Sequence, residues 1–367
     1  MESILSRYAK LLVHYCLETK PGDRMYLKST TLAEPLVREV FRTAVRAGAM
    51  VEVSLDFSEQ ERIFMQEAMD PQLKYVSPMY RQAMETYDTY LYIRAPHNLR
   101  ENQSIDANKR KIRQAAHKEV SETYFRRTAT RDLRRNLCQF PTQASAQEAG
   151  MSLEEYEHFV YNACKLYDDD PVKSWVNVRQ SQQQIVDLLN SREKVRYVGD
   201  GIDITFSTKG RTWINSDGQT NMPSGEVYTS PVEDSVNGQI HFTYPAIYMG
   251  HEVEGVTLWV KDGYIQKWEA KRGKEFLDQI FEIEGTRRFG EAAIGTNYSI
   301  SQFTKNILFD EKIGGTVHMA VGQSYLQTGG KNQSSVHWDM IAEMTKEGEI
   351  YADDEKIYEK GRFLFVD

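Results

Sequence analysis

Cysteine is scarce in this chain of 367 residues, which contains Cys16, Cys138 and Cys164 and no other thiol. Their number is odd, they lie far apart, and no Cys-x-x-Cys pair occurs. A disulfide framework or a thiolate zinc site requires paired or closely spaced cysteines. The sequence therefore argues against both, and we expect the three cysteines to be ordinary packing residues.

Nucleotide-binding loops and excess positive charge are missing as well. No Gly-x-Gly-x-x-Gly motif follows the first predicted strand, and no Gly-x-x-x-x-Gly-Lys-Ser/Thr motif occurs. The net charge is -8, from 53 acidic and 45 basic residues. Because nucleic-acid binding needs a basic surface to neutralise phosphates, we expect neither nucleotides nor nucleic acids to be the main ligands.

Long apolar segments are also absent from the sequence. No window contains 18 uninterrupted apolar residues, and charged residues interrupt the apolar run at the N-terminus. This pattern predicts neither a transmembrane helix nor a signal peptide. We expect a soluble protein that has no membrane partner and is located in the cytoplasm.

The first half of the chain alternates predicted helices and strands. Met25–Leu27 is a predicted strand, Leu32–Ala47 a helix and Met50–Leu55 a second strand, which together form a βαβ unit. A helix over Pro78–Thr86 and a strand over Thr89–Ala95 continue the alternation. This half therefore predicts an open α/β domain with a largely parallel sheet.

The second half differs from the first in its pattern of predicted elements. A helix-rich stretch, Ser152–Ser191, predicts a connector, and we expect the domain boundary near Asn190–Val195. Beyond it, strand-like runs alternate with turns, and 18 of the 23 glycines fall between Gly199 and Ser335. The expected fold class is α+β with two domains: residues 1–190 form the α/β domain with its helical connector, and residues 191–367 a mainly antiparallel β domain with short helices that carries the metal site.

A hairpin is predicted within the second domain. Two strand-like runs, Glu252–Val260 and Tyr264–Ala270, flank the sequence Lys261-Asp262-Gly263. Asp-Gly between two such runs is typical of a tight hairpin turn. We therefore expect these two runs to pair in antiparallel fashion.

Two of the eight histidines lie in a polar, Gly-rich stretch near the C-terminus. These are His318 and His337, and the second is followed two positions later by Asp339. On a strand, residues two apart point to the same side, so His337 and Asp339 share one face while Val336 and Trp338 occupy the other. Imidazole and carboxylate groups are typical ligands of zinc and cobalt, so the stretch predicts a metal site.

Two glutamates in Gly-flanked segments are further candidates. Glu291, in FGEAAIGTN, lies in an apolar context where a carboxylate needs a cation, either a metal or a basic neighbour such as Arg287 or Arg288. Glu226, in SGEVYTSP, has a context that fits a surface carboxylate equally well. Tyr325, taken alone, fits a core aromatic residue.

Four motifs taken in order resemble a known family. They are SGEVYTSP, GEAAIGTN, GGTVHMAVGQSY and NQSSVHWDM, and together they resemble the thermophilic-type metalloaminopeptidases, which include aminopeptidase T, aminopeptidase S and PepS. The N-terminal KPGDRMYL and the hairpin AIYMGHEVEGVTLWVKDGYI are similar to the family too, so the resemblance covers essentially the whole chain. The chain is somewhat short for the family, and residues 98–106 do not align with it, but neither departure involves the motifs.

The resemblance implies a metal-dependent aminopeptidase that removes N-terminal residues from peptides through a water activated by two divalent metals. It implies six ligands, which are Glu226, Glu291, His318, Tyr325, His337 and Asp339. The expected metals are zinc or cobalt, with magnesium and manganese as alternatives. Glu291 and Tyr325 are the expected catalytic residues, the first bridging the metals and the second coordinating them or stabilising an oxyanion. The implied partners are peptides with a free N-terminus and a second copy in a homodimer.

Three alternatives stay open at this stage. One is a dipeptidase or another metal amidase that uses the same centre. Another is a noncatalytic scaffold with a structural metal, although a closed structural zinc needs four ligands rather than six. The third is a nonmetal enzyme that uses Glu226 and Glu291 as an acid/base pair, which leaves both histidines unexplained.

Overall fold

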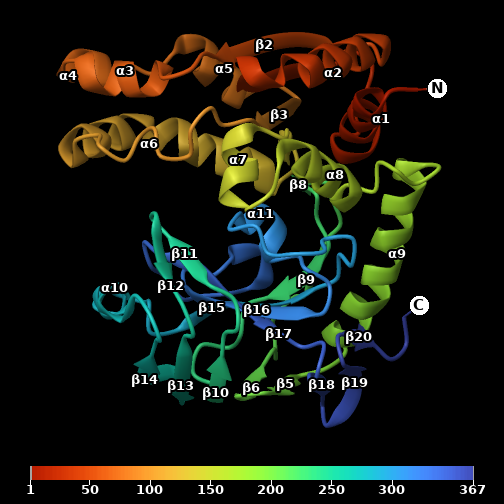
Figure 1. The fold of residues 1–367 in the computed structure, drawn as a ribbon, viewed down its shortest axis with the longest axis vertical. Coiled ribbons are helices and arrows are strands. Elements are labelled where there is room, and N and C mark those ends of the chain that lie inside the picture. Colours follow the sequence, from red (N-terminus) through yellow and green to blue (C-terminus); the bar gives the residue numbers. More distant parts are fainter. Residues whose placement is uncertain (1, 367) are drawn as a thin grey trace. The chain divides into compact units, whose positions relative to one another are not determined.

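A computed structural model describes residues 2–366 and divides the chain into two compact units. The first unit extends to Val172 and also includes Gly218–Pro223. The second unit comprises Lys173–Asp217 and the chain from Ser224 onward. Figure 1 labels most elements of both units.

The first unit is an α/β domain around one parallel sheet. Its five strands lie in the order β2-β1-β3-β4-β8, and every adjacent pair is parallel. The strands are β1 (Arg24–Thr30), β2 (Met50–Asp56), β3 (Thr89–Arg94), β4 (Arg134–Gln139) and β8 (Asn221–Met222). The helices are α1 (Ile4–Lys10) with its π-helical continuation Leu11–Cys16, the 3-10 turn Thr31–Ala33, α2 (Glu34–Arg46), α3 (Gln60–Glu67), α4 (Asp70–Leu73), α5 (Pro78–Thr86), α6 (Ala107–Ala129), α7 (Gln143–Glu148) and α8 (Leu153–Ala163). The predicted open α/β domain with a largely parallel sheet is confirmed.

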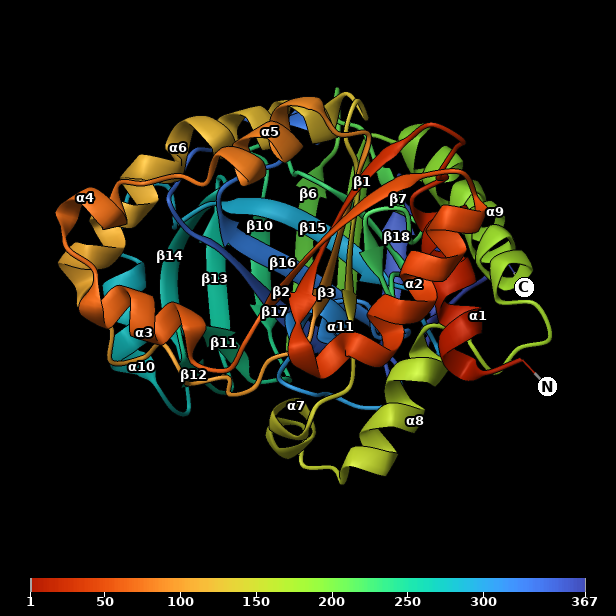
Figure 2. The same ribbon diagram turned by 90° about the horizontal axis from the view of Figure 1, so that it is seen from above.

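Helices cover both faces of this sheet, as Figure 2 shows for strands β1–β3. The hydroxyl of Thr30 caps the 3-10 turn before α2, and α2 then buries Leu36 and Val40 on one side. On the other side, Tyr26 of β1 packs with Val120 of α6 in a second apolar cluster. Parallel sheets are usually buried in this way, because the helical crossovers that connect parallel strands cover the faces.

The second unit is built from antiparallel sheets. An eight-stranded sheet has the order β14-β13-β10-β6-β5-β18-β19-β20, a five-stranded sheet has the order β17-β16-β15-β9-β7, and β11-β12 form a separate hairpin. The strands are β5 (Lys194–Gly199), β6 (Ile202–Ser207), β7 (Ile214–Ser216), β9 (Glu226–Thr229), β10 (Asn237–His241), β11 (Ala246–Tyr248), β12 (His251–Val253), β13 (Thr257–Lys261), β14 (Tyr264–Glu269), β15 (Phe289–Gly295), β16 (Thr316–Gly322), β17 (His337–Glu343), β18 (Glu349–Ala352), β19 (Glu355–Glu359) and β20 (Arg362–Phe363). The helices are α9 (Pro171–Asn190), α10 (Lys274–Ile280), α11 (Ile307–Asp310) and the 3-10 turn Leu326–Thr328.

The two large sheets share one hydrophobic core. Tyr197 and Ile204 of the eight-stranded sheet and Val317 and Met340 of the five-stranded sheet belong to the same buried cluster. Two sheets that pack face to face bury one side of each, which leaves the far side of the five-stranded sheet available for polar groups. The predicted antiparallel second domain is confirmed.

The unit boundary differs from the one expected from the sequence. The sequence predicts a boundary near Asn190, whereas the structure divides the chain after Val172, so that nearly all of α9 belongs to the second unit. The reason is that Ile185 and Leu189 of α9 are buried in the core of the second unit. An amphipathic pattern indicates that a helix buries one face, but it does not identify the core that receives this face.

The predicted strand Glu252–Val260 is wrong in one respect. It is split into β12 and β13, because Glu254 leaves the ladder and forms an isolated bridge with Arg272. The predicted hairpin is confirmed, since Lys261 pairs with Tyr264 across a two-residue turn. All three cysteines are buried thiols, as expected of packing residues. Among the described helices, none is both long and apolar enough to cross a membrane.

The assignment of α9 to the second unit predicts where a core substitution acts. Leu189→Ala should destabilise the second unit by about 2–5 kcal/mol, because it leaves a cavity at a fully buried position. Tryptophan fluorescence during urea unfolding reports on this unit, since it contains all five tryptophans, Trp175, Trp213, Trp259, Trp268 and Trp338.

The matched control is Gln184→Ala at an exposed position of the same helix, which should leave the fluorescence midpoint unchanged. Equal midpoints for Leu189→Ala and the wild type would show that α9 does not stabilise the second unit.

Candidate metal centre

One face of the five-stranded sheet gathers five of the six predicted ligands. Directly paired residues in an antiparallel ladder point to the same side of the sheet. Asp339 pairs with Ala320, Ala320 pairs on its other side with Glu291, and His318 pairs with Ala293. The side chains of Asp339, Glu291 and His318 therefore project from three neighbouring strands toward one side.

Glu226 and His337 complete this face at the strand ends. Glu226 pairs with Gly295 at the end of β15, and His337 pairs with Gly322 at the end of β16. The positions opposite the five ligand-type residues in these ladders are mostly small: Ala293, Gly295, Ala320 and Gly322. Small residues here leave space above the sheet between the carboxylates and imidazoles.

The opposite face of the same strands is apolar. Val317 and Met319 flank His318 along β16, and Trp338 and Met340 flank Asp339 along β17; all four are buried in the core. Side chains on both strands therefore alternate between the two faces of the sheet, as expected from the sequence. Packing of the apolar side chains fixes the direction in which the polar ones point.

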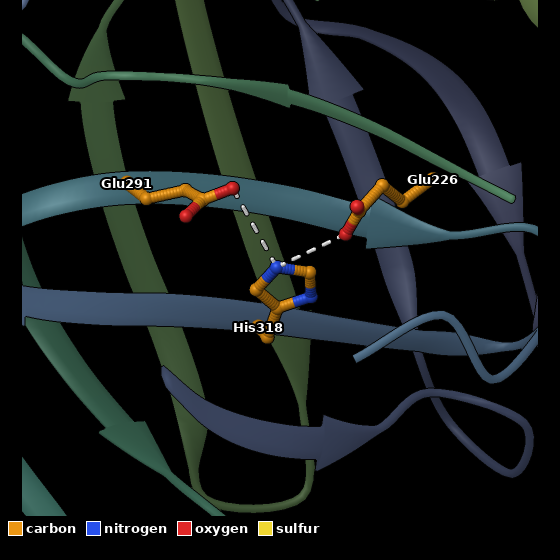
Figure 3. A group of neighbouring side chains, drawn as sticks. All are labelled: Glu226, Glu291 and His318. Carbon is orange, nitrogen blue, oxygen red and sulfur yellow. Dashed lines mark ion pairs between the residues drawn. The ribbon is translucent and has the colours of Figure 1, made fainter. Parts of the chain in front are cut away.

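Glu226, Glu291 and His318 form a compact group, which we call the Glu226 triad. The Nε2 atom of His318 lies 3.5 Å from Oε2 of Glu226 and 3.7 Å from Oε1 of Glu291. Figure 3 shows both carboxylates pointing toward the same ring nitrogen. Each of the three residues offers one ligand atom, and these atoms lie within 4.8 Å of one another.

Glu291 also belongs to a second group, the Asp339 triad, with His337 and Asp339. The Nε2 atom of His337 lies 3.1 Å from Oε2 of Glu291 and 3.5 Å from Oδ1 of Asp339. The two oxygens of Glu291 thus face different histidines. Glu291 is the member that the two triads share.

The alternative partners considered for the two glutamates do not fit their positions. Glu291 is 4% exposed, and its ionic partners are the two histidines. Arg288 instead donates to the backbone oxygen of Glu233, and Arg287 donates to that of Phe281. Glu226 is 6% exposed, so it is not a surface carboxylate.

Tyr325 follows β16 and approaches the Asp339 triad. Its hydroxyl lies 3.3 Å from Nε2 of His337, and its ring packs edge-on against Tyr228 at a centroid distance of 5.4 Å. Although Tyr325 is 36% exposed as a whole, loss of hydration at its hydroxyl, and then the charges of Glu291 and Asp339, raise its pKa well above the usual range. All six residues named from the sequence therefore meet at one site, with Tyr325 as a neutral phenol.

Backbone geometry fixes the start of the Glu226 strand. Gly225 has a φ of +118°, and a Cβ atom there would lie 2.6 Å from Cβ of Asn297, so the chain requires glycine immediately before Glu226. The buried amide of Gln182 in α9 donates to the backbone oxygen of Glu226 at 3.3 Å and accepts from the hydroxyl of Thr296 at 2.8 Å. Helix α9 therefore supports the strand that presents Glu226.

A second glycine controls the orientation of His337. A Cβ atom at Gly290 would lie 2.2 Å from the backbone oxygen of Gln323, and the β15–β16 ladder has a bulge between Phe289 and Glu291. The same Gln323 oxygen accepts a hydrogen bond from Nδ1 of His337 at 2.8 Å. A metal-binding histidine commonly donates its other N–H to a carbonyl in this way, which leaves Nε2 free for the metal.

Comparison with known proteins identifies the family. The family described as thermophilic metalloprotease (M29) matches residues 1–363. The chain belongs to this family. It is 27% identical to Aminopeptidase 2 of Geobacillus stearothermophilus, over 99% of this chain and 98% of that protein, and 27% identical to Aminopeptidase PepS of Streptococcus thermophilus, over 92% and 91%.

A solved structure agrees with this assignment at the level of the fold. The structure titled "Wild-type AmpT from Thermus thermophilus" matches this M29 protein with a TM-score of 0.83 and 21% identity, over 98% of this chain and 99% of that chain. The predicted fold class is confirmed, and so is the resemblance to the metal-dependent aminopeptidase family. The M29 protein is a peptide hydrolase of a metal-dependent class.

The carboxylates of the M29 centre shift the pKa values of its two histidines. Burial alone would lower the pKa of His318, but the hydrogen bond and charge of Glu291 and the charge of Glu226 raise it to about 9. Burial also opposes protonation of His337, yet Asp339 and then Glu291 raise the pKa of His337 to about 12. Burial would raise the pKa of Asp339, but His337 and His318 lower it to about 2. The carboxylates of the centre therefore favour positive charge at the position of both imidazoles.

The donor set fits divalent cations. Three polar atoms of the centre have no hydrogen-bond partner among the described residues: Oε2 of Glu226, Oδ1 of Asp339 and Nδ1 of His318. The first two face the imidazole nitrogens of their triads. Buried carboxylate oxygens normally have partners, and a cation bound between carboxylate and imidazole would satisfy them.

Two charged residues of the centre were not identified from the sequence. Lys312 is fully buried and pairs with Glu311, and its ammonium lies 3.8 Å from Oε1 of Glu226. Burial raises the pKa of Glu311 to about 8, although Lys312 opposes the shift. The only sequence signal was a run of three charged residues, Asp310–Lys312, shortly before the apolar strand β16, which fits a surface turn equally well.

The loop that carries this pair depends on Asp310. Asp310, at the end of α11, is 2% exposed, and its Oδ1 accepts from the backbone N–H and the hydroxyl of Thr304 at 2.7 and 2.9 Å. Burial raises the pKa of Asp310 to about 7, although these hydrogen bonds oppose the shift. The loop between β15 and β16 therefore contains an acid that stays protonated well above its ordinary value of 3.8.

The small residues at the sheet surface predict a steric test. Ala320→Val places two methyl groups between Glu291 and Asp339 and should weaken metal binding by roughly tenfold or more. The measurement is bound metal per chain after equilibrium dialysis.

The matched control is Ala292→Val on the opposite face of the neighbouring strand, which should instead overpack the core and cost about 1–3 kcal/mol of stability. Unchanged metal content in Ala320→Val would mean that this face does not hold the metal.

Asp310 predicts a pH dependence of stability. Because the folded state holds the Asp310 proton up to about pH 7 and the unfolded chain releases it near 3.8, the free energy of unfolding should fall as pH rises through this window. Asp310→Asn has no proton to lose, so its stability should fall less between pH 4 and pH 7, by a difference on the order of a few kcal/mol.

Urea unfolding followed by tryptophan fluorescence measures the difference, with Asp187→Asn at an exposed position of α9 as the control. Parallel pH profiles for the wild type and Asp310→Asn would contradict the assignment.

Proposed function

We propose that this M29 protein is an aminopeptidase that binds two divalent ions through Glu226, Glu291, His318, Tyr325, His337 and Asp339. The observation that carries the proposal is the position of Glu291, whose Oε1 and Oε2 face His318 and His337 respectively. A carboxylate placed between two triads suits a bridging ligand. The proposed division gives one ion to the Glu226 triad and the other to the Asp339 triad.

Bound divalent ions supply Lewis acidity, which lowers the pKa of a water and polarises the peptide carbonyl. The charges of the ligands suit this chemistry. Glu226, Glu291 and Asp339 contribute three negative charges against the four positive charges of two dications, which leaves room for an anionic nucleophile. Nitrogen and oxygen ligands in this combination favour zinc or cobalt over magnesium.

Glu291 and Tyr325 have the catalytic roles in this proposal. Glu291 accepts the proton of the attacking water at its carboxylate and returns it to the nitrogen of the leaving amine, as the water oxygen bonds to the carbonyl carbon and the C–N bond breaks. Tyr325 donates a hydrogen bond from its hydroxyl to the carbonyl oxygen as negative charge develops there. The raised pKa of Tyr325 supports this role, since a neutral phenol is a donor.

The substrate is a peptide with a free N-terminus. The names of the relatives support this choice, since Aminopeptidase 2 and Aminopeptidase PepS match nearly the whole chain. A neutral α-amine would be held by an open coordination position of a bound ion, because the three carboxylates are already engaged as ligands. A homodimer and a cytoplasmic location, both expected from the sequence, stay predictions.

Metal removal and one substitution test the proposal. A chelator should abolish hydrolysis of amino-acid anilides, and added zinc or cobalt should restore it. Glu291→Gln should lower kcat/KM on the order of a thousandfold, because the amide cannot take up the proton and bridges poorly. The control is Glu282→Gln at an exposed position of the same unit.

Substrate series separate the neighbouring activities. Longer peptides should be cleaved from the N-terminus, and N-acetylated peptides should be resistant. Turnover restricted to dipeptides would identify a dipeptidase instead. Activity that survives both chelation and Glu291→Gln would exclude the two-metal mechanism.

A further inference from the structure

Lys312 lies beside the candidate metal centre without taking part in the proposed hydrolysis. It follows α11 in the loop between β15 and β16, and its side chain is fully buried. Lysine is almost never fully buried unless it is paired. Here its ammonium pairs with Glu311 and lies 3.8 Å from Oε1 of Glu226. A permanent cation next to a metal ligand calls for a functional explanation.

The main chain holds Lys312 in this position. The N–H of Asn297 donates to the backbone oxygen of Lys312 at 3.0 Å, and the N–H of Gly314 donates to the backbone oxygen of Asn297 at 3.0 Å. Asn297 also donates through its side-chain amide to the backbone oxygen of Ser224, two residues before Glu226. The backbones of Lys312 and Glu226 are therefore tied together through Asn297.

Lys312 carries its positive charge in this environment. Its ammonium forms an ion pair with the carboxylate of Glu311, and Oε1 of Glu226 lies 3.8 Å away, so two carboxylates favour the charged form. The ammonium thus belongs to the fixed charge distribution of the centre.

The cation is placed unequally with respect to the two triads. Among the described residues, one ion pair joins a lysine or arginine to a carboxylate of the centre. This pair is formed by Lys312 and Glu226. Glu291 and Asp339 pair with histidines. Lys312 approaches Oε1 of Glu226, which leaves Oε2 as the oxygen that faces His318.

We propose that Lys312 is a positioning residue that makes the two metal positions unequal. It holds Glu226 so that Oε2 is presented to the ion, and its charge makes the Glu226 triad bind its ion more weakly than the Asp339 triad does. This inference rests on the proposed two-metal function. A fixed positive charge opposes a second cation nearby, and the low dielectric of a buried site strengthens the effect.

Cobalt(II) titration of the metal-free full-length protein tests the proposal. Visible absorption follows the ligand environment of each ion, and equilibrium dialysis counts the ions bound. The wild type should bind two ions in two affinity classes. Glu226→Gln should remove the weaker class, and Asp339→Asn should remove the tighter one.

Substitutions of Lys312 and of Glu311 should change the affinity of the weaker class of bound ions in opposite directions. Lys312→Met removes the opposing charge and should tighten the weaker class by about tenfold. Glu311→Gln leaves Lys312 to interact with Glu226 alone and should loosen it. Lys312→Arg keeps the charge and should retain two unequal classes. All three variants should change the tighter class less than the weaker one, because the carboxylate that lies 3.8 Å from Lys312 is that of Glu226.

Two further variants exclude simpler explanations. Lys305→Met removes a lysine of the same loop that pairs with Glu252, and it should change neither class. The double variant Glu311→Gln/Lys312→Met removes both members of the buried pair, so neither is left unpaired, and the weaker class should still be tighter than in the wild type. If the double variant binds the weaker class no more tightly than the wild type, the tightening in Lys312→Met comes from the unpaired carboxylate of Glu311. That result would overturn the proposal.

The outcomes also separate this proposal from the proposed function. Binding of a single ion by the wild type would overturn the two-metal centre and this inference with it. Two ions of equal affinity, or a weaker class that Lys312→Met leaves unchanged, would overturn the role of Lys312 alone. Circular dichroism of each metal-free variant establishes that it is folded. If Lys312→Met is not folded, the looser second class expected for Glu311→Gln and the two unequal classes retained in Lys312→Arg decide.

Discussion

Side-chain alternation along the five-stranded sheet is the constraint on which the rest of the second unit depends. Successive residues of β15, β16 and β17 point to opposite sides, so each strand serves the hydrophobic core with one face and the metal centre with the other. A shift of one residue in any ladder would place ligands in the core and apolar groups in the site. Packing of Val317, Met340 and their neighbours therefore fixes the positions of His318 and Asp339.

The same arrangement forces charges of one sign together. Carboxylates that are buried side by side repel one another, and each loses hydration. The carboxylates raise the pKa of both histidines, and the buried ammonium of Lys312 lies beside Glu226, so positive charge is favoured at three positions around them. A bound metal ion would replace the histidine protons but not Lys312. The centre thus has an exchangeable set of positive charges and a fixed one.

Sequence reasoning succeeded where the relevant signal was local. Strand–helix–strand spacing was enough to predict the parallel sheet, and a separation of two positions was enough to place His337 and Asp339 on one face. Tyr325 required the ordered motifs of the family, because its approach to His337 depends on how the chain turns after β16. Lys312 could not be found, since its partner Glu226 is distant in sequence and only the fold brings them together. The boundary after Val172 was missed for a similar reason, because α9 could have packed on either core.

One carbonyl oxygen links the backbone of β15 to a histidine of the site. The bulge at Gly290 lets the backbone oxygen of Gln323 come close enough to the sheet to accept a hydrogen bond from Nδ1 of His337. Gly290 therefore determines which ring nitrogen of His337 is available, although it contributes no atom of a side chain. In a mutational scan for activity, substitutions at Gly290 should group with those of the ligands, and a map of catalytic side chains alone would leave this position out.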